Sequence, residues 1–281
     1  MIADAGAARG LLVSAVTNAF WATSQQEAER VLREVSSIRM IALSTDAYHQ
    51  QSIPFARVRN AIAAAQALNI PYNVAVCTER EDDPAYRAVL AQLHEIAHPD
   101  LINTAITFPV GRAAERIGLD RYQTSKTPPI AACSAGSAPI IFPDGRMIAC
   151  IGPVIDLRHE HPLCYGNLRE KTLAEILDAA EVNPILHTIR VWGPRKLISL
   201  LQEAGRNDLL PEWYIQDSVC HACYSLMSNP ETVAWLGKLA ADCAYREKVA
   251  YARLYYLRET RMLELMAERE GLQLRLSRGP S

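Results

Sequence analysis

Apolar residues recur along the first hundred residues in two alternating patterns. Short segments rich in apolar residues lie at 11–16, 40–43, 72–76 and 102–108, and such segments are typical of strands buried in a parallel sheet. Between these segments, apolar residues spaced three and four apart predict helices with one buried face, including Ala28, Val31, Leu32 and Val35. Strands that alternate with helices predict βαβ units and an α/β fold with a parallel sheet.

Local signals predict where each helix begins. Ser24 and Glu27 have the spacing of a capping box, in which side chains bind free backbone N–H groups. Pro54 suits the first turn of the second helix, and Asp83-Pro84 opens the third. Further along the chain, helices are expected from Thr172, from Pro184 and across residues 232–269.

Polar residues follow successive predicted strands. Asn18 comes after the first strand, and Ser44 and Asp46 come after the second. Because the carboxyl ends of parallel strands meet at one edge, these side chains are candidates for a ligand-binding site. The alternative is that Ser44 and Asp46 only cap the following turn. His49, one turn beyond Asp46, is expected to be a surface histidine.

Cysteines dominate the chemistry of the second half. Residues 140–149 predict a β-hairpin with its turn at Pro143-Asp144-Gly145, which would return Cys150 towards Cys133. Cys220 and Cys223 form a CxxC pair, whose spacing lets both thiolates face one metal. Thiolates suit both iron–sulfur clusters and zinc, so the four cysteines predict a metal centre of either kind.

The remaining cysteines and one histidine are weaker candidates for metal ligands. Cys164 could replace one of the four ligands. Cys77, in a predicted strand, and Cys243, in a predicted helix, are expected to be small buried apolar residues. His221, inside the CxxC pair, is expected to be a surface residue and not a ligand.

Composition narrows the class of protein. About a fifth of the 281 residues are charged and the net charge is -2, which argues against a nucleic-acid or anionic-membrane partner. No apolar run reaches the roughly 18 residues that a membrane span needs. The sequence has no convincing export signal, which favours a cytoplasmic protein. In such a protein, seven cysteines favour metal ligation over disulfides.

Cys133, Gly145 and Cys150 have a spacing that resembles the start of a SPASM or twitch domain in radical S-adenosylmethionine (SAM) proteins. Thr17-Asn18 and Ser44-Thr45-Asp46 resemble strand-end segments of that family's barrel. The resemblance implies a partial (βα) barrel, strands 3–6 of the family's core, at residues 1–120. A cysteine-rich α+β domain at 121–228 and a helical extension at 229–281 would follow.

The resemblance also implies cofactors and their ligands. Ser44, Asp46 and Asn18 would contact SAM in a full-length form. Cys133, Cys150, Cys220 and Cys223 would hold one auxiliary [4Fe-4S] cluster. A single cluster is expected because no further cysteine follows closely after Cys223.

One departure from the family pattern concerns catalysis. The CxxxCxxC motif that holds the SAM-cleaving cluster is absent, so this chain is not expected to cleave SAM reductively. A full-length form is expected to be an oxidoreductase or a peptide-modifying maturase acting on a peptide or protein. A partner could supply the missing barrel strands, because an exposed apolar sheet edge would otherwise remain. The alternative is a catalytically inactive binding module stabilised by a cluster or by zinc.

Overall fold

The computed structural model describes residues 2–133 and 138–263. The chain divides into two compact units, each with its own core. The sheet unit comprises Met1–Thr107 and Asp120–Tyr122, and the cysteine unit comprises Phe108–Leu119 and Gln123–Ser281.

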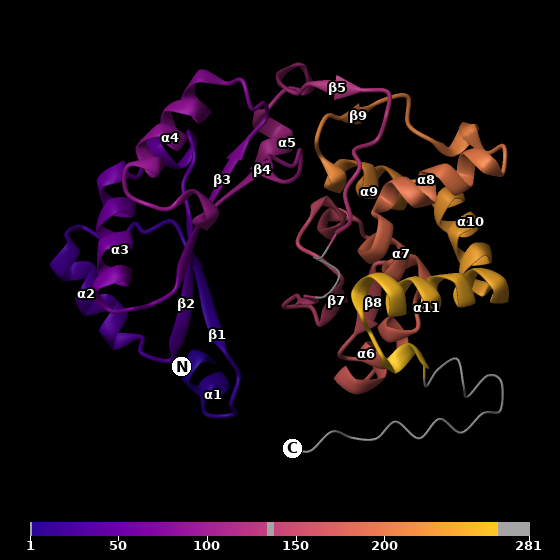
Figure 1. The fold of residues 1–281 in the computed structure, drawn as a ribbon, viewed down its shortest axis with the longest axis horizontal. Coiled ribbons are helices and arrows are strands. Elements are labelled where there is room, and N and C mark those ends of the chain that lie inside the picture. The colour runs from indigo at the N-terminus through magenta and orange to yellow at the C-terminus, as the bar shows by residue number, and fades with distance from the viewer. Residues whose placement is uncertain (1, 134–137, 264–281) are drawn as a thin grey trace. The chain divides into compact units, whose positions relative to one another are not determined.

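A four-stranded sheet organises the sheet unit, and its order is β1-β2-β3-β4 (Figure 1). The strands are β1 (Val13–Thr17), β2 (Ile38–Ser44), β3 (Tyr72–Thr78) and β4 (Ile102–Ile106). All neighbouring strands run parallel, with Thr17 opposite Leu43 and Leu43 opposite Val74. The predicted α/β class and the parallel sheet are therefore confirmed.

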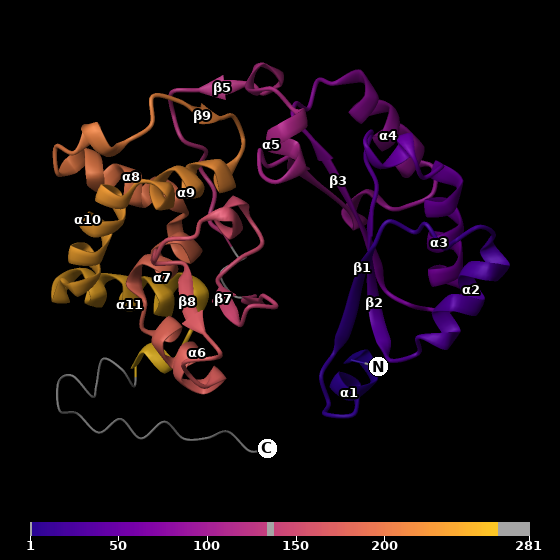
Figure 2. The ribbon, with the colours of Figure 1, turned by 180° about the vertical axis from the view of Figure 1, so that it is seen from behind.

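Three helices lie along the same face of this sheet in both views (Figures 1 and 2). They are α2 (Gln25–Glu34), α3 (Phe55–Ala67) and α4 (Pro84–His94); the short helices α1 (Ile2–Ala7), η1 (His49–Gln51) and η2 (Pro99–Leu101) complete the unit. The Ser24 side chain accepts a hydrogen bond from the Glu27 backbone N–H, and Asp83 caps α4. The predicted starts of α2 and α4 are thus confirmed, and α3 begins at Phe55, so Pro54 is its N-cap, one residue before the first turn where it was predicted.

Within the described residues of the sheet unit itself, the helices cover one sheet face and leave the other face and the β1 edge uncovered. Leu43, Val74 and Val76 point into the core, whereas Ser14 and Val16 are exposed. Val16 is 77% exposed and Leu12, just before β1, is 90% exposed. The expected apolar surface is therefore present at the edge strand.

Helices and short antiparallel strands build the cysteine unit. The chain forms α5 (Arg112–Arg116), β5 (Thr124–Ser125), β6 (Ile140–Ile141), β7 (Arg146–Ile148), η5 (Pro153–Asp156), β8 (Cys164–Asn167), α6 (Leu173–Glu181), α7 (Pro184–Trp192), α8 (Pro194–Glu203), η6 (Asn207–Leu209), β9 (Tyr214–Ile215), α9 (Val219–Ser228), α10 (Pro230–Ala241) and α11 (Cys243–Leu257); η3 (Leu119–Arg121) lies at the boundary between the units.

The predicted hairpin is confirmed. Strands β6 and β7 pair antiparallel, and β8 adds to β7. Gly145 occupies the turn with φ +85°, a conformation that favours glycine. Strand β5 pairs with β9. This pairing joins residues about ninety positions apart, which local sequence patterns do not reveal.

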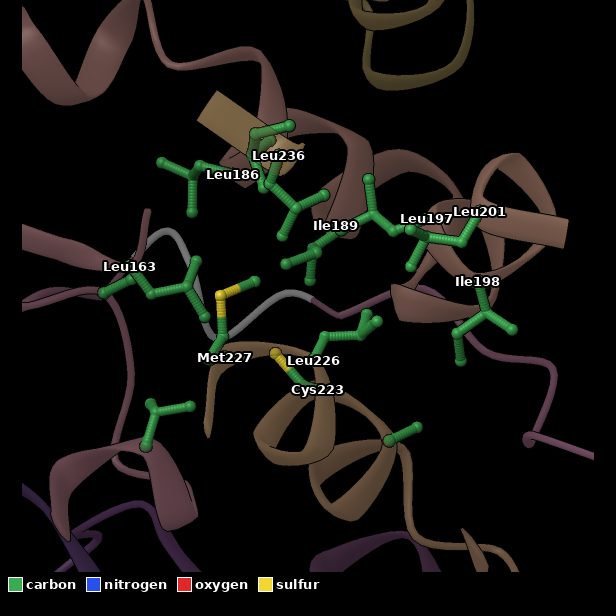
Figure 3. Close-up of a cluster of buried hydrophobic side chains, with 14 of the residues drawn as sticks. Leu163, Leu186, Ile189, Leu197, Ile198, Leu201, Cys223, Leu226, Met227 and Leu236 are labelled. Carbon is green, nitrogen blue, oxygen red and sulfur yellow. The ribbon is translucent and has the colours of Figure 1, made fainter. Parts of the chain in front are cut away.

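Helices α7, α8 and α9 enclose the core of the cysteine unit (Figure 3). Cys223, Leu226 and Met227 of α9 point into the same cluster as Ile189 of α7 and Leu197 of α8. The predicted helices at the C-terminal end form α10 and α11. Tyr245 and Val249 of α11 belong to this core, and the last eighteen residues lie outside the described part.

None of the helices in the described residues combines the length and apolarity needed to cross a bilayer.

Candidate metal centre

The four predicted ligands come from three separate segments of the cysteine unit. Cys133 lies in an irregular segment before the β6–β7 hairpin, and Cys150 follows β7 by two residues. Cys220 and Cys223 lie in the first turns of α9. Only tertiary packing brings these segments together.

The junction of α7 and α8 positions Cys133. The Cys133 backbone N–H donates a hydrogen bond to the Ile189 carbonyl of α7 at 3.1 Å. Gly193, between the helices, has φ +77°, and a Cβ there would lie 1.8 Å from the Ala131 carbonyl oxygen. Glycine is therefore required where the chain crosses this junction towards Cys133.

The three-stranded sheet and the loop after it position Cys150. The Ala149 backbone N–H donates to the Leu163 carbonyl at 2.9 Å, which ties the end of the hairpin to the chain entering β8. Gly152 then follows two residues later, and its backbone N–H bonds to the Cys150 sulfur.

The start of α9 positions the CxxC pair. The Ser218 side chain accepts a hydrogen bond from the His221 backbone N–H and caps the helix. Residues three apart share a helix face, so Cys220 and Cys223 project from the same side. The positive end of the helix dipole favours thiolates in this first turn.

Electrostatics place the four sulfurs close to one another. Burial, followed by the neighbouring Cys133 and Cys150, raises the pKa of Cys220 to about 12. Burial, followed by Cys150, Cys133 and Cys220, raises the pKa of Cys223 well above its ordinary value. Burial also raises the pKa of Cys150, against the opposing hydrogen bond from Gly152. The four thiols therefore face a common region.

A glycine keeps part of that region open. A Cβ added at Gly152 would lie 3.5 Å from the Cys150 sulfur and 3.7 Å from the Cys220 sulfur. Since Gly152 has an ordinary φ of -70°, its backbone would accept another residue. The missing side chain leaves space beside two of the four sulfurs.

The thiols are not gathered around a single point. Within residues 2–133 and 138–263, no group of three or more His, Cys, Asp and Glu side chains is arranged to hold a metal ion.

Cys164 begins β8 and pairs with Ile148 of β7, two residues before Cys150. Burial and then the negative charge of Glu160 raise its pKa. Cys77 of β3 is half-buried, with its pKa raised by burial, Asp46 and Glu79. Cys243 is exposed, so its predicted burial is wrong: it begins α11 at the solvent-facing end.

His221 is a structural residue, and the prediction of a surface position is wrong. Its Nδ1 accepts a hydrogen bond from the Ile215 backbone N–H at 3.1 Å. The imidazole stacks on Trp213 with ring centroids 5.3 Å apart. Burial lowers the pKa of His221, so the neutral ring holds the start of α9 against β9.

The strand-end candidates lie at one edge of the sheet unit. Thr17 pairs with Leu43, so Asn18 and Ser44 are the next residues at the same edge. The Asn18 side-chain oxygen accepts a hydrogen bond from the Phe20 backbone N–H at 3.3 Å. The edge position of these polar residues agrees with the predicted topology.

Asp46 is already bound to its own turn. Its Oδ1 accepts hydrogen bonds from the backbone N–H groups of Tyr48 and His49, and its Oδ2 lies 2.8 Å from His49 Nδ1. Burial opposes ionisation of Asp46, but the hydrogen bonds from His49 and Tyr48 outweigh it and lower the pKa. The same contact raises the pKa of His49. This geometry matches the capping alternative for Asp46.

The sequence analysis missed a buried carboxylate beside this turn. Glu79 directly follows β3 and accepts a hydrogen bond from the Tyr48 hydroxyl at 2.8 Å. Its position after a strand was the available signal, because polar residues at strand ends mark ligand-binding edges.

No protein-family model matches the sequence, and comparison with curated proteins finds no match either. The family resemblance therefore rests on the cysteine spacing and the strand-end residues described above.

Proposed function

We propose that this chain is an iron–sulfur protein of the radical SAM/SPASM type. One auxiliary [4Fe-4S] cluster would be held by Cys133, Cys150, Cys220 and Cys223. The observation that carries the proposal is the convergence of four thiols from three segments, each of the last three with its pKa raised by burial and by neighbouring thiolates.

Metal binding would explain why four thiols, at least three of them with raised pKa values, lie near one another in the cysteine unit. Without a metal, burial and mutual repulsion keep Cys220 and Cys223 protonated near neutral pH. A bound cation compensates the negative charges, and its binding releases the thiol protons. The helix N-terminus and the Gly152 N–H are already arranged to stabilise thiolate sulfur.

The family resemblance of the cysteine spacing favours a cluster over a single zinc ion. Zinc with bonds of about 2.3 Å to four thiolates is the alternative that the same residues allow. When bound, a [4Fe-4S] cluster transfers electrons or anchors substrate, with a potential set by burial and hydrogen bonds to sulfur.

The sheet unit supplies the rest of the proposal. Its parallel strands would form part of a (βα) barrel, and Ser44, Asp46 and Asn18 at the strand ends would contact SAM. In a full-length form the activity would be that of an oxidoreductase or a peptide-modifying maturase. A partner would cover the apolar β1 edge at Leu12 and Val16.

A second candidate is a catalytically inactive binding module stabilised by a cluster or by zinc. The contacts of Asp46 favour it, because both carboxylate oxygens already bind the following turn. In that case the strand-end residues would have a structural role alone.

Metal analysis of the anaerobically purified chain tests the proposal. We expect about four iron and four sulfide per chain, with broad visible absorption from thiolate-ligated iron. Gly152→Ala should fold, since its Cβ makes ordinary contacts, but should reduce iron loading by filling the space beside two sulfurs. Gly237→Ala is the matched control, because a Cβ there meets nothing within 4 Å.

Cysteine variants sharpen the assignment. Cys220→Ser should lose the cluster, whereas Cys164→Ser should keep it. One zinc per chain without iron would replace the cluster by a structural zinc site. Four free thiols with no metal would overturn the proposal in both forms.

A further inference from the structure

A pocket of about 190 Å³ lies in the sheet unit, between the ends of β2 and β3 and the start of α4. Its lining includes Tyr48, Cys77, Glu79, Asp83, Tyr86 and Arg121. The proposed SAM contacts Ser44, Asp46 and Asn18 do not line it, although the pocket adjoins the turn that Asp46 caps.

Glu79 carries an unused hydrogen-bond acceptor in the wall of this pocket. The residue is 5% exposed, and its Oε2 accepts a hydrogen bond from the Tyr48 hydroxyl. Its Oε1 is buried and accepts no hydrogen bond from the described residues. A buried carboxylate oxygen without a donor is costly, so a donor from a ligand would stabilise it.

Negative charge outweighs positive charge around the pocket. Glu79 and Asp83 face one cation, Arg121, whose guanidinium nitrogen lies 3.8 Å from Glu79 Oε2 and 3.5 Å from Asp83 Oδ2. Both separations exceed the usual hydrogen-bond length of about 3.2 Å. Arg121 is also largely exposed, so its attraction is screened by water.

The neighbouring side chains respond to this excess charge. Burial and then Glu79 raise the pKa of Tyr48 to about 12. Burial, followed by Asp46 and Glu79, raises the pKa of Cys77. Tyr48 and Cys77 therefore stay neutral near pH 7, and the carboxylates remain without a buried counter-charge.

We propose that this pocket binds the primary ammonium group of a small amine, with Glu79 as its main acceptor. An ammonium supplies three N–H donors and a positive charge, and the faces of Tyr48 and Tyr86 suit a cation. The volume is below the roughly 300–1,000 Å³ of pockets that hold drug-sized ligands, so the ligand is small. Two carboxylates beside a guanidinium are a poor set for a divalent metal ion.

Calorimetric titration of the full chain with propylammonium chloride at pH 7 tests this proposal. Propanol is the neutral analogue, and magnesium chloride is the divalent competitor. We expect the wild-type chain to bind propylammonium and neither of the other two. Glu79→Gln should weaken binding roughly tenfold or more, because hydrogen bonds to charged groups are the strong ones.

Two exposed positions keep the test independent of folding defects. Arg121→Gln removes the competing cation and should tighten propylammonium binding several-fold. Asp82→Asn lies outside the pocket, where Asp82 pairs with Arg80, and should leave the affinity unchanged. The proposal is overturned if wild type does not bind propylammonium, if Glu79→Gln binds it equally well, or if magnesium binds more tightly.

Discussion

The sheet unit and the cysteine unit bury different kinds of side chain. In the sheet unit, aliphatic residues such as Leu43, Val74 and Ile62 fill the space between one sheet face and three helices. In the cysteine unit, Cys223 shares the core with aliphatic residues, and Cys133 and Cys150 pack against the same cluster. Apolar burial alone stabilises the first arrangement, whereas the second includes groups that gain most when a cation is bound.

The two units also differ in the length of their strands. The four parallel strands of the sheet unit have five to seven residues, while the strands of the cysteine unit have two to four residues. Short strands contribute few hydrogen bonds, so contacts between distant segments have a larger share in the stability of the cysteine unit. The comparison predicts that the two units respond differently to metal removal and to single substitutions.

The largest expected effect is loss of the metal. Treatment with a chelator under anaerobic conditions, or Cys223→Ser, should destabilise the cysteine unit, since metal-binding free energy adds directly to folding free energy. The sheet unit should be unaffected. Hydrogen exchange followed by mass spectrometry measures both at once, through amide protection in β3 and in α7.

Cys243→Ser provides the control, because Cys243 is exposed and lies outside the four converging thiols. Equal loss of protection in β3 and α7 after chelation would contradict the difference between the units.

A smaller loss of stability is expected when a buried ion-pair network in the cysteine unit is disrupted. Arg253 is 4% exposed, and its guanidinium lies 2.5 Å from Glu181 Oε1 and 2.6 Å from Glu259 Oε2. Arg253→Met should lower the free energy of unfolding of the cysteine unit by about 3 kcal/mol, because Glu181 loses its cationic partner and Glu259 keeps only Arg190. Denaturant titration measures this loss.

Arg246→Met on the same helix is the matched control, since Arg246 is exposed. It should change the free energy of unfolding by less than about 0.5 kcal/mol. Similar losses of unfolding free energy for both variants would show that the positive charge on α11, and not the buried ion-pair network, stabilises the cysteine unit.

The smallest effect is expected at a helix cap in the sheet unit. Ser24→Ala removes the acceptor for the Glu27 backbone N–H and should cost about 1 kcal/mol. Amide exchange in α2 should accelerate, while exchange in α7 stays unchanged. Thr23→Ala, one residue earlier, should leave α2 exchange as in wild type; an equal effect there would remove the capping explanation.

Local patterns predicted most elements of both units. Strands β1 to β4 and the helices that begin at Gln25, Phe55 and Pro84 were expected from periodicity and from capping residues. The Thr172 capping box and Asn183 likewise begin α6 and α7 where helices were predicted. Such signals act within a few residues, so the sequence displays them directly.

Contacts between distant residues explain the predictions that were wrong. His221 was expected at the surface, but Trp213 and the Ile215 N–H hold it in place. Cys243 was expected to be buried, although it lies at the exposed start of α11. Neither position can be inferred from helical spacing, because burial depends on which neighbouring segment covers that turn.

By itself the sequence determined the alternation of strands and helices, the hairpin between Cys133 and Cys150, and the four cysteines proposed as ligands. The tertiary structure decided that these thiols converge, since the pKa values of Cys220 and Cys223 respond to burial and to the neighbouring thiolates. It also decided that Glu79 is buried beside Tyr48. Burial and electrostatic coupling depend on distances through space, and these are set only when the segments pack together.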